Sequence, residues 1–340
     1  INNFVKDACK QSGVAAEHIY KIVIVGNTCM HHIILGVDVT YVGLAPYAPV
    51  IRDSLAVPAR DLPLKAAINA QVCLLPIVAG FVGADTMACV LATRIYDSDE
   101  IRTLVDIGTN AEIVLAGHDR VLAASSPTGP AFEGAQISSG QRATPGAIER
   151  VRIDATTGKP RIRIIGVDAW SDEDGFAEAA LPTGVTGICG SGIIEVVAEL
   201  WMAGLMDADG VIAGADTKPS DRIVADGRTF SYVLFDPAEL GLGGDPVLVT
   251  QNDIRAIQLA KAALYAGIRL LMDHLEVETI DEIGLAGAFG SHIDTIRATV
   301  HEHLATSHLG EFNRQSRQSR QSRQSRQSGQ TRESSQTRQS

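Results

Sequence analysis

Residues 104 to 115, LVDIGTNAEIVL, place a carboxylate at the end of an apolar run and beside a glycine turn. Glycine has no Cβ, so backbone N–H groups of such a turn can approach an anion closely. The side chains of Thr109 and Asn110 add hydrogen-bond donors. Asp106 cannot bind phosphate directly, but a carboxylate can hold hydrated Mg²⁺ against it. Taken alone, the segment fits either a phosphate-binding hairpin or an ordinary hairpin whose aspartate bonds its own turn.

Two further glycine-rich turns each join a predicted strand to a predicted helix. Gly287–Gly290 follows the apolar run EIGLA, and GICGSG at 187–192 opens a helix. Backbone N–H groups at such a turn can bind a nucleotide phosphate. Close packing of a helix on a strand explains the same glycines, so both interpretations stay open for each turn.

Candidate metal ligands are few. His31 and His32 are adjacent on a predicted helix and point about 100° apart, which favours a structural role over a shared ion. Asp85, near the start of another predicted helix, can cap that helix or line a site.

The five cysteines form no Cys-x-x-Cys pair, which indicates a reducing, cytoplasmic setting without an iron–sulfur site in this chain.

The composition limits the classes of function. The 340 residues are 45% hydrophobic, which suffices for one large or two ordinary domains. A net charge of −11 argues against a nucleic-acid-binding protein. We find neither a signal peptide nor a membrane span. The repeated Arg-Gln-Ser tail at 313–340 lacks apolar residues, so we expect it to be disordered.

Hydrophobic periodicity predicts both helices and strands along the chain. Thr250 and Asp253 have the spacing of a capping box in front of a long helix. The predicted helices cover residues 2–18 with a stop at Gly13, 28–35, 83–95, 190–206 and 251–275. The predicted strands cover residues 21–26, 103–107, 112–116, 120–125, about 150–154, 161–167 and 280–285.

Several stretches, in one order along residues 1–295, resemble the ATP-dependent reductive activators of corrinoid proteins (RACo-type). These activators belong to the actin-like ATPase superfamily. The stretches are VGNTCMHHIILGVD at 25–38, AGFVGADT at 79–86, LVDIGTNAEIVL at 104–115, GPAFEGAQISSG at 129–140, TPGAIERV at 144–151, GICGSGIIE at 187–195, QNDIRAIQLAKAAL at 251–264 and AGAFGSHID at 286–294.

The resemblance implies an α/β actin-like ATPase fold with two ribonuclease-H-like halves, ATP and Mg²⁺ lying between them. Residues 1–100 would be the remainder of the first half, including a connecting helix, with that half incomplete. Residues 101–295 would be the second half, with a phosphate loop and an adenosine turn. The disordered tail would follow at 313–340.

The same resemblance implies roles for single residues. Asp106 would be catalytic and would hold Mg²⁺ through water. Two residues of the long helix would flank the base or ribose, or else be solvated helix charges: Arg255 and Lys261. The nucleotide would contact the phosphate loop at Gly108, Thr109 and Asn110, and the adenosine turn at Gly287, Ala288, Phe289 and Gly290.

In this family, ATP drives the reduction of a corrinoid protein from Co(II) to Co(I), and a [2Fe-2S] domain supplies the electron. We expect that domain and the first phosphate loop to lie outside this chain, which looks like the middle of a longer enzyme. The expected partner is a corrinoid protein, with no nucleic acid and no membrane, and a homodimer stays open. The alternatives are a small-molecule kinase of the same superfamily and a non-catalytic fragment that only binds the corrinoid protein.

Overall fold

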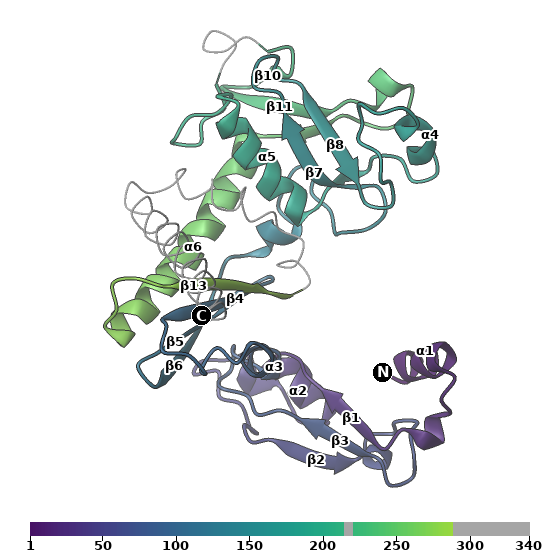
Figure 1. The fold of residues 1–340 in the computed structure, drawn as a ribbon, viewed down its shortest axis with the longest axis vertical. Helices are drawn as coiled ribbons and strands as arrows, with labels where there is room; N and C mark the ends of the chain where they lie inside the picture. The colour runs from purple at the N-terminus through teal and green to yellow at the C-terminus, as the bar shows by residue number, and fades with distance from the viewer. Residues whose placement is uncertain (214–219, 288–340) are drawn as a thin grey trace, which may run out of the picture. The chain divides into compact units, whose positions relative to one another are not determined.

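A computed structural model describes residues 1–213 and 220–287. The chain divides into two compact units (Figure 1). Unit 1 comprises residues 1–99 with 119–125, and unit 2 comprises residues 100–118 and everything from 126 onward. The Arg-Gln-Ser tail and residues 288–290 lie outside the described residues.

Unit 1 is built on a three-stranded sheet of β1 (Lys21–Ile24), β3 (Gln71–Leu74) and β2 (Leu55–Pro58), in that order. β1 runs parallel to β3, and β2 runs antiparallel to it. Val72 and Leu74 of β3 are buried, and Ile22 and Ile24 pack against the same cluster. Alternate residues of each strand therefore supply one apolar face.

Three α-helices complete unit 1: α1 (Asn2–Ser12), α2 (Thr28–Ile34) and α3 (Ala84–Thr93). The Asn27 side chain accepts a hydrogen bond from the N–H of Met30 and so caps α2. The predicted stop at Gly13 is confirmed, because this residue adopts a left-handed conformation that ends α1. The predicted helical range to residue 18 is therefore too long. A separate 3₁₀ turn, η1, follows at Ala16–His18.

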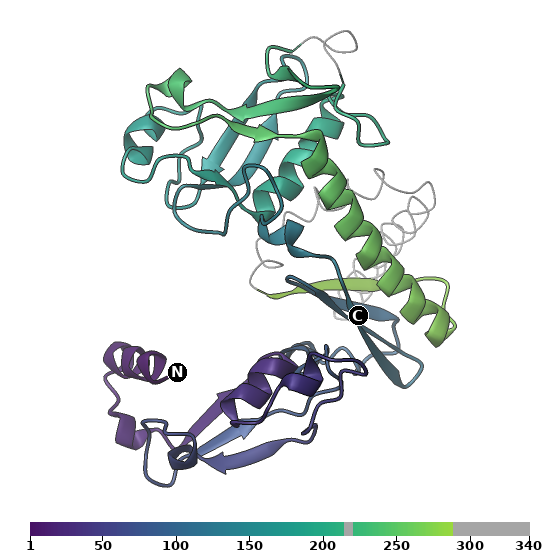
Figure 2. The ribbon, with the colours of Figure 1, turned by 180° about the vertical axis from the view of Figure 1, so that it is seen from behind.

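A four-stranded sheet has the order β13-β4-β5-β6, and all of its strands except β6 belong to unit 2. β4 (Arg102–Ile107), β5 (Ala111–Gly117) and β6 (Arg120–Ser126) follow one another in the chain as the predicted meander. β13 (Glu282–Ala286) joins the other edge of β4 in parallel, although it lies about 180 residues further along the chain. The long helix α6 (Gln251–Leu275) packs on β5, and Figures 1 and 2 show it running from there to the second part of the unit.

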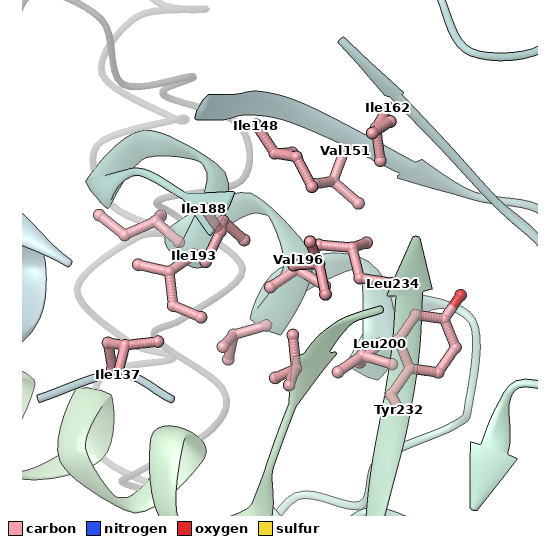
Figure 3. Close-up of a cluster of buried hydrophobic side chains, with 14 of the residues drawn as sticks. Ile137, Ile148, Val151, Ile162, Ile188, Ile193, Val196, Leu200, Tyr232 and Leu234 are labelled. Atoms are coloured by element: carbon pink, nitrogen blue, oxygen red, sulfur yellow. The ribbon is translucent and has the colours of Figure 1, made fainter. Parts of the chain in front are cut away.

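That second part contains two smaller sheets, β8-β7-β9 and β10-β11-β12. Their buried side chains form one core with those of α5, as Figure 3 shows. The hydroxyl of Tyr232, fully buried there, donates to the carbonyl of Gly158 at 2.9 Å, and burial raises its pKa. The elements are β7 (Ala147–Ile153), β8 (Pro160–Ile164), α4 (Phe176–Ala180), β9 (Gly187–Ile188), α5 (Gly190–Met202), β10 (Ile223–Asp226), β11 (Thr229–Phe235) and β12 (Val247–Val249).

Close packing accounts for the glycines of the 187–192 turn. A Cβ on Gly192 would collide with the carbonyl oxygen of Ile148, and one on Gly187 would lie 2.6 Å from the carbonyl oxygen of Ser139. Gly192 therefore lets the backbone of α5 lie directly against β7, and Gly187 lets β9 lie directly against the chain at Ser139. α5 ends at Met202, one turn before the predicted end at residue 206.

Candidate nucleotide site

The ends of β4 and β13 bring two of the predicted site segments together. The two strands are parallel neighbours, with Asp106 opposite Ala286 in their register. Gly287 follows with a φ of 84°, and a Cβ at this position would collide with Oδ1 of Asp106. The expected phosphate loop and the first residue of the expected adenosine turn are thus in direct contact. Ala288, Phe289 and Gly290 of that turn lie outside the described residues.

The turn after Asp106 is tight and leaves its tip exposed. The N–H of Gly108 donates to the carbonyl oxygen of Asn110 at 2.9 Å, which closes the turn. Thr109 at the tip is exposed, whereas Asp106 is half-buried at the strand end. The side chain of Thr109 therefore lies where an incoming ligand can reach it.

One residue of this site was missed by the sequence interpretation. The hydroxyl of Thr109 donates to Oε2 of Glu133 at 2.9 Å, and Oε1 of Glu133 lies 3.9 Å from where a Cβ of Gly108 would stand. Glu133 is the last residue of the 3₁₀ helix η4 (Pro130–Glu133). The only signal in the sequence is an acid within a glycine-rich stretch, 24 residues from its partner.

A buried aspartate ties the segment after η4 to the start of α6. Asp253 is 1% exposed and completes the predicted capping box with Thr250. Its Oδ1 also accepts hydrogen bonds from the N–H of Ser138 at 2.8 Å and from the Ser138 hydroxyl at 3.1 Å. One carboxylate therefore caps the helix and holds the chain that leads to the phosphate loop.

The two cationic residues predicted on α6 lie in different surroundings. Nη1 of Arg255 donates to the carbonyl oxygen of Asp209 at 2.8 Å and to Oε1 of Gln258 at 2.5 Å. Arg255 and Arg228 also line a cavity of about 390 Å³. Lys261, further along the helix, is half-buried. The structure thus brings Arg255 to the loop that contains Asp209.

The residues at the strand ends suit a magnesium ion. Mg²⁺ is usually held by one or two carboxylates together with substrate phosphates and water. Asp106 offers such a carboxylate beside a turn that a phosphate can approach. Among residues 1–213 and 220–287, no three His, Cys, Asp or Glu side chains gather as a metal-binding group.

The cysteines do not fit an iron–sulfur cluster. A [2Fe-2S] cluster needs about four ligands on one site, usually thiolates. All five cysteines fall in the part of the chain that the structure describes, and they are not gathered into a metal-binding group. They are Cys9, Cys29, Cys73, Cys89 and Cys189.

The adjacent histidines of unit 1 are both buried. His32 Nδ1 lies 2.8 Å from the carbonyl oxygen of Thr28, and its Nε2 accepts from the N–H of Val50 at 3.0 Å. In these contacts Nδ1 faces an acceptor and Nε2 faces a donor. Neither ring nitrogen of His31 has a hydrogen-bond partner among the described residues. Burial, together with the neighbouring His32, lowers the pKa of His31.

Two protein-family models match the chain. The family model described as the C-terminal domain of RACo, the ASKHA domain, matches residues 100–314. The model described as the RACo middle region matches residues 1–98. Within the described residues, no helix combines the length and the apolar character needed to cross a membrane.

Individual relatives lead to the same family. Over 300 residues the chain is 33% identical to the corrinoid activation enzyme RamQ of Eubacterium limosum, covering 86% of this chain and 47% of that protein. Over 256 residues it is 27% identical to a Co(II) methylated amine-specific corrinoid protein reductase of Methanosarcina barkeri, covering 72% of this chain and 42% of that protein.

A solved structure also matches. The reductive activator for corrinoid, iron–sulfur protein superposes with a TM-score of 0.70 at 34% identity, covering 88% of this chain and 45% of that one. The chain thus spans less than half the length of these relatives. The family resemblance noted in the sequence is confirmed. The chain belongs to the RACo family and has the α/β actin-like ATPase (ASKHA) fold.

Proposed function

We propose that this chain is the ATP-binding and ATPase module of a reductive activator that returns a corrinoid protein from Co(II) to Co(I). The observation that carries the proposal is the contact between Gly287 and Asp106 at the ends of two parallel strands. It joins the turn expected to hold phosphate to the turn expected to hold adenosine. The names of the relatives, which are corrinoid activators and reductases, support the corrinoid protein as partner.

In this proposal the chain positions ATP and neutralises its charge, as is usual for phosphoryl transfer to water. The turn at residues 108–110 holds phosphate oxygens through the hydroxyl of Thr109 and through backbone N–H groups other than that of Gly108, which closes the turn. Asp106 fixes the hydrated Mg²⁺, which when bound offsets the charge of the phosphates. Lys261 contributes to binding the base or ribose. Free energy from ATP drives the uphill reduction by changing how the activator and the corrinoid protein associate.

We propose that the electron comes from a [2Fe-2S] group held outside residues 1–340. The cysteines of this chain are scattered over both units, and in the described part of the chain they join no metal-binding group of three or more His, Cys, Asp or Glu side chains. The chain would then contribute nucleotide binding and partner binding, and the redox centre would belong to another part of the activator.

The test is ATP turnover of residues 1–340, with and without a corrinoid protein poised in the Co(II) state. We expect the corrinoid protein to change the rate, and Asp106→Asn to lower it by at least a factor of about 100. Turnover that Asp106→Asn leaves intact would remove the proposed role of this residue. Nucleotide binding without turnover would favour the non-catalytic alternative, and phosphorylation of a small metabolite would favour the kinase.

A further inference from the structure

Thr109 and Glu133 form a contact that conflicts with the proposed ligand of Thr109. The hydroxyl donates to Oε2 of Glu133 at 2.9 Å. A hydroxyl has one hydrogen and can donate it to one acceptor at a time. The hydroxyl of Thr109 can therefore donate its hydrogen bond to Glu133 or to a phosphate oxygen, but not to both.

The charge of Glu133 opposes a phosphate in the same place. Its Oε1 lies 3.9 Å from where a Cβ of Gly108 would stand, so the carboxylate is beside the turn itself. Two like charges about 4 Å apart repel one another by an amount worth roughly fivefold in affinity in bulk water, and by more at the lower effective dielectric near a protein surface. A phosphate bound at Thr109 would have to displace this carboxylate or bind more weakly.

The backbone around Glu133 is held in place, whereas its side chain is exposed. Ala131 and Phe132 of η4 are buried in the core. A few residues further on, Ser138 is fixed to the start of α6 by Asp253. A phosphate at Thr109 can therefore displace the carboxylate by a rotation of the Glu133 side chain, without a shift of η4.

We infer that Glu133 is a positioning residue that holds Thr109 while the site lacks nucleotide and exchanges it for a terminal phosphate. This inference rests on the proposed function. It adds that the terminal phosphate, and not the nucleoside, is what turns the Glu133 side chain away from Thr109.

The test measures binding of adenosine and of the non-hydrolysable triphosphate β,γ-imido-ATP to residues 1–340 by calorimetry with Mg²⁺ present. Glu133→Gln keeps the shape and an acceptor but removes the charge. We expect it to bind the triphosphate about tenfold more tightly than the wild type and to bind adenosine equally. Weaker binding of the triphosphate by Glu133→Gln would mean that the carboxylate holds the cation, and would overturn the inference.

A matched control exists on the 3₁₀ helix η5 (Pro237–Leu240). Like η4 it begins with proline and is followed by a left-handed glycine, but its Glu239 pairs with Arg222. Glu239→Gln should leave both affinities unchanged. If it tightens triphosphate binding as much as Glu133→Gln does, the effect is one of net charge and the inference fails.

A double-mutant cycle gives a second measurement. Thr109→Val combined with Glu133→Gln should show a coupling of about fivefold in the unfolding equilibrium without nucleotide. With saturating β,γ-imido-ATP the coupling should fall to about one, because Thr109 has changed its acceptor. An undiminished coupling contradicts the exchange. If the wild type binds no nucleotide, both the proposed function and this inference are wrong. If the wild type binds nucleotide and every variant binds it with the same affinity, only this inference is wrong.

Discussion

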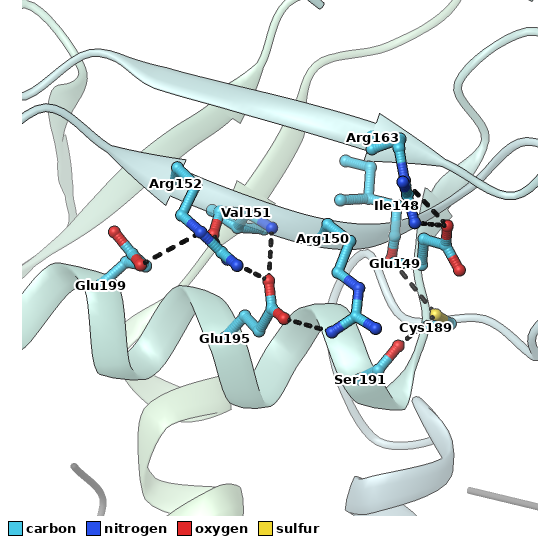
Figure 4. Close-up of polar contacts among 10 residues, drawn as sticks. All are labelled: Ile148, Glu149, Arg150, Val151, Arg152, Arg163, Cys189, Ser191, Glu195 and Glu199. Atoms are coloured by element: carbon cyan, nitrogen blue, oxygen red, sulfur yellow. Dashed lines mark hydrogen bonds and ion pairs between the residues drawn. The ribbon is translucent and has the colours of Figure 1, made fainter. Parts of the chain in front are cut away.

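Glu195 on α5 accepts a hydrogen bond from the backbone N–H of Val151 on β7, at 2.8 Å (Figure 4). One helical turn further on, Glu199 accepts from the N–H of Ile153 at 2.9 Å. The short strand β9 pairs only with the first two residues of β7. Four helical residues and two strand residues both span about 6 Å, so the two carboxylates match alternate N–H groups of the strand. The two carboxylates thus accept hydrogen bonds from the part of the β7 edge that β9 does not cover.

We predict that Glu195→Ala lowers the free energy of unfolding of unit 2 by about 3–5 kcal/mol. Glu195 is 1% exposed and also receives hydrogen bonds from Arg150 and Arg152, both at 2.7 Å. Its removal leaves two guanidinium groups and one strand N–H without their buried acceptor. Both tryptophans of the chain, Trp170 and Trp201, lie in this unit, so urea unfolding can be followed by their fluorescence.

The control for this prediction is Glu278→Ala. The Glu278 side chain is 90% exposed and pairs with Arg269 at 4.0 Å, so its loss should change stability by less than about 0.5 kcal/mol. Equal effects of the two substitutions would show that the buried carboxylate contributes no more than a surface charge.

Gly287→Ala should disturb the proposed nucleotide site directly. Its Cβ would collide with Oδ1 of Asp106, and the φ of 84° disfavours any side chain. We expect affinity for Mg²⁺ and ATP to fall at least tenfold, measured by calorimetry. Gly175→Ala is the matched control, because Gly175 has a φ of 86° but no atom within 4 Å of the new Cβ. A similar loss of affinity in both variants would point to general destabilisation instead.

His31 should make unit 1 sensitive to acid. Its pKa is lowered from the ordinary value of 6.5, since burial disfavours the charged ring and His32 adds to the effect. The unfolded state therefore binds more protons than the folded state once the pH falls through 6.5. Stability is fully present above this pH and is lost as the pH falls toward the lowered pKa.

We expect His31→Leu to flatten this pH dependence between about pH 7 and pH 5, because leucine cannot be protonated. Hydrogen exchange in peptides of β1 and β3, corrected for the intrinsic rate at each pH, would measure it. His18→Leu is the control, since His18 is exposed on η1 and should leave the dependence unchanged. A dependence that persists in His31→Leu would assign it to another group.

Much of the fold was open to prediction because its signals are local. The hairpin of β4 and β5 has one apolar run before its glycine turn and one after it. The start of α6 has Thr250 and Asp253 at the spacing of a capping box. In both cases the interacting groups are within a few residues of each other, so spacing alone specifies the geometry.

The remaining features depend on contacts between distant residues. Glu133 meets Thr109 across 24 residues, and Glu195 meets Val151 across 44. No spacing rule connects such pairs along the chain. The parallel pairing of β13 with β4 crosses about 180 residues. The family resemblance suggested only that the turns after these strands contact the same nucleotide. Asp253 was expected to cap a helix, and its second bond to Ser138 depends on how the chain folds back on itself.

The second bond of Asp253 leads to a final prediction. The residue is 1% exposed, and its two oxygens accept from Ser138 and from the N–H of Thr250 at 2.8 Å. Asn at this position has only one acceptor, so its NH₂ group must face one of these N–H donors. Asp253→Asn should therefore cost about 1–3 kcal/mol of stability in urea unfolding.

Thr250→Ala tests the cap with the carboxylate left in place. It removes the hydroxyl that accepts from the N–H of Asp253 at 3.2 Å and that lies 3.3 Å from the hydroxyl of Ser138, while both bonds from Ser138 to Asp253 remain. Loss of such a cap costs about 1 kcal/mol. If Asp253 only capped α6, the two variants would lose similar amounts. We expect the larger loss in Asp253→Asn, together with faster hydrogen exchange at Ser138, since that residue is then released from α6. If both variants lose the same stability and exchange at Ser138 is unchanged, the hydrogen bonds between Ser138 and Asp253 do not contribute to stability.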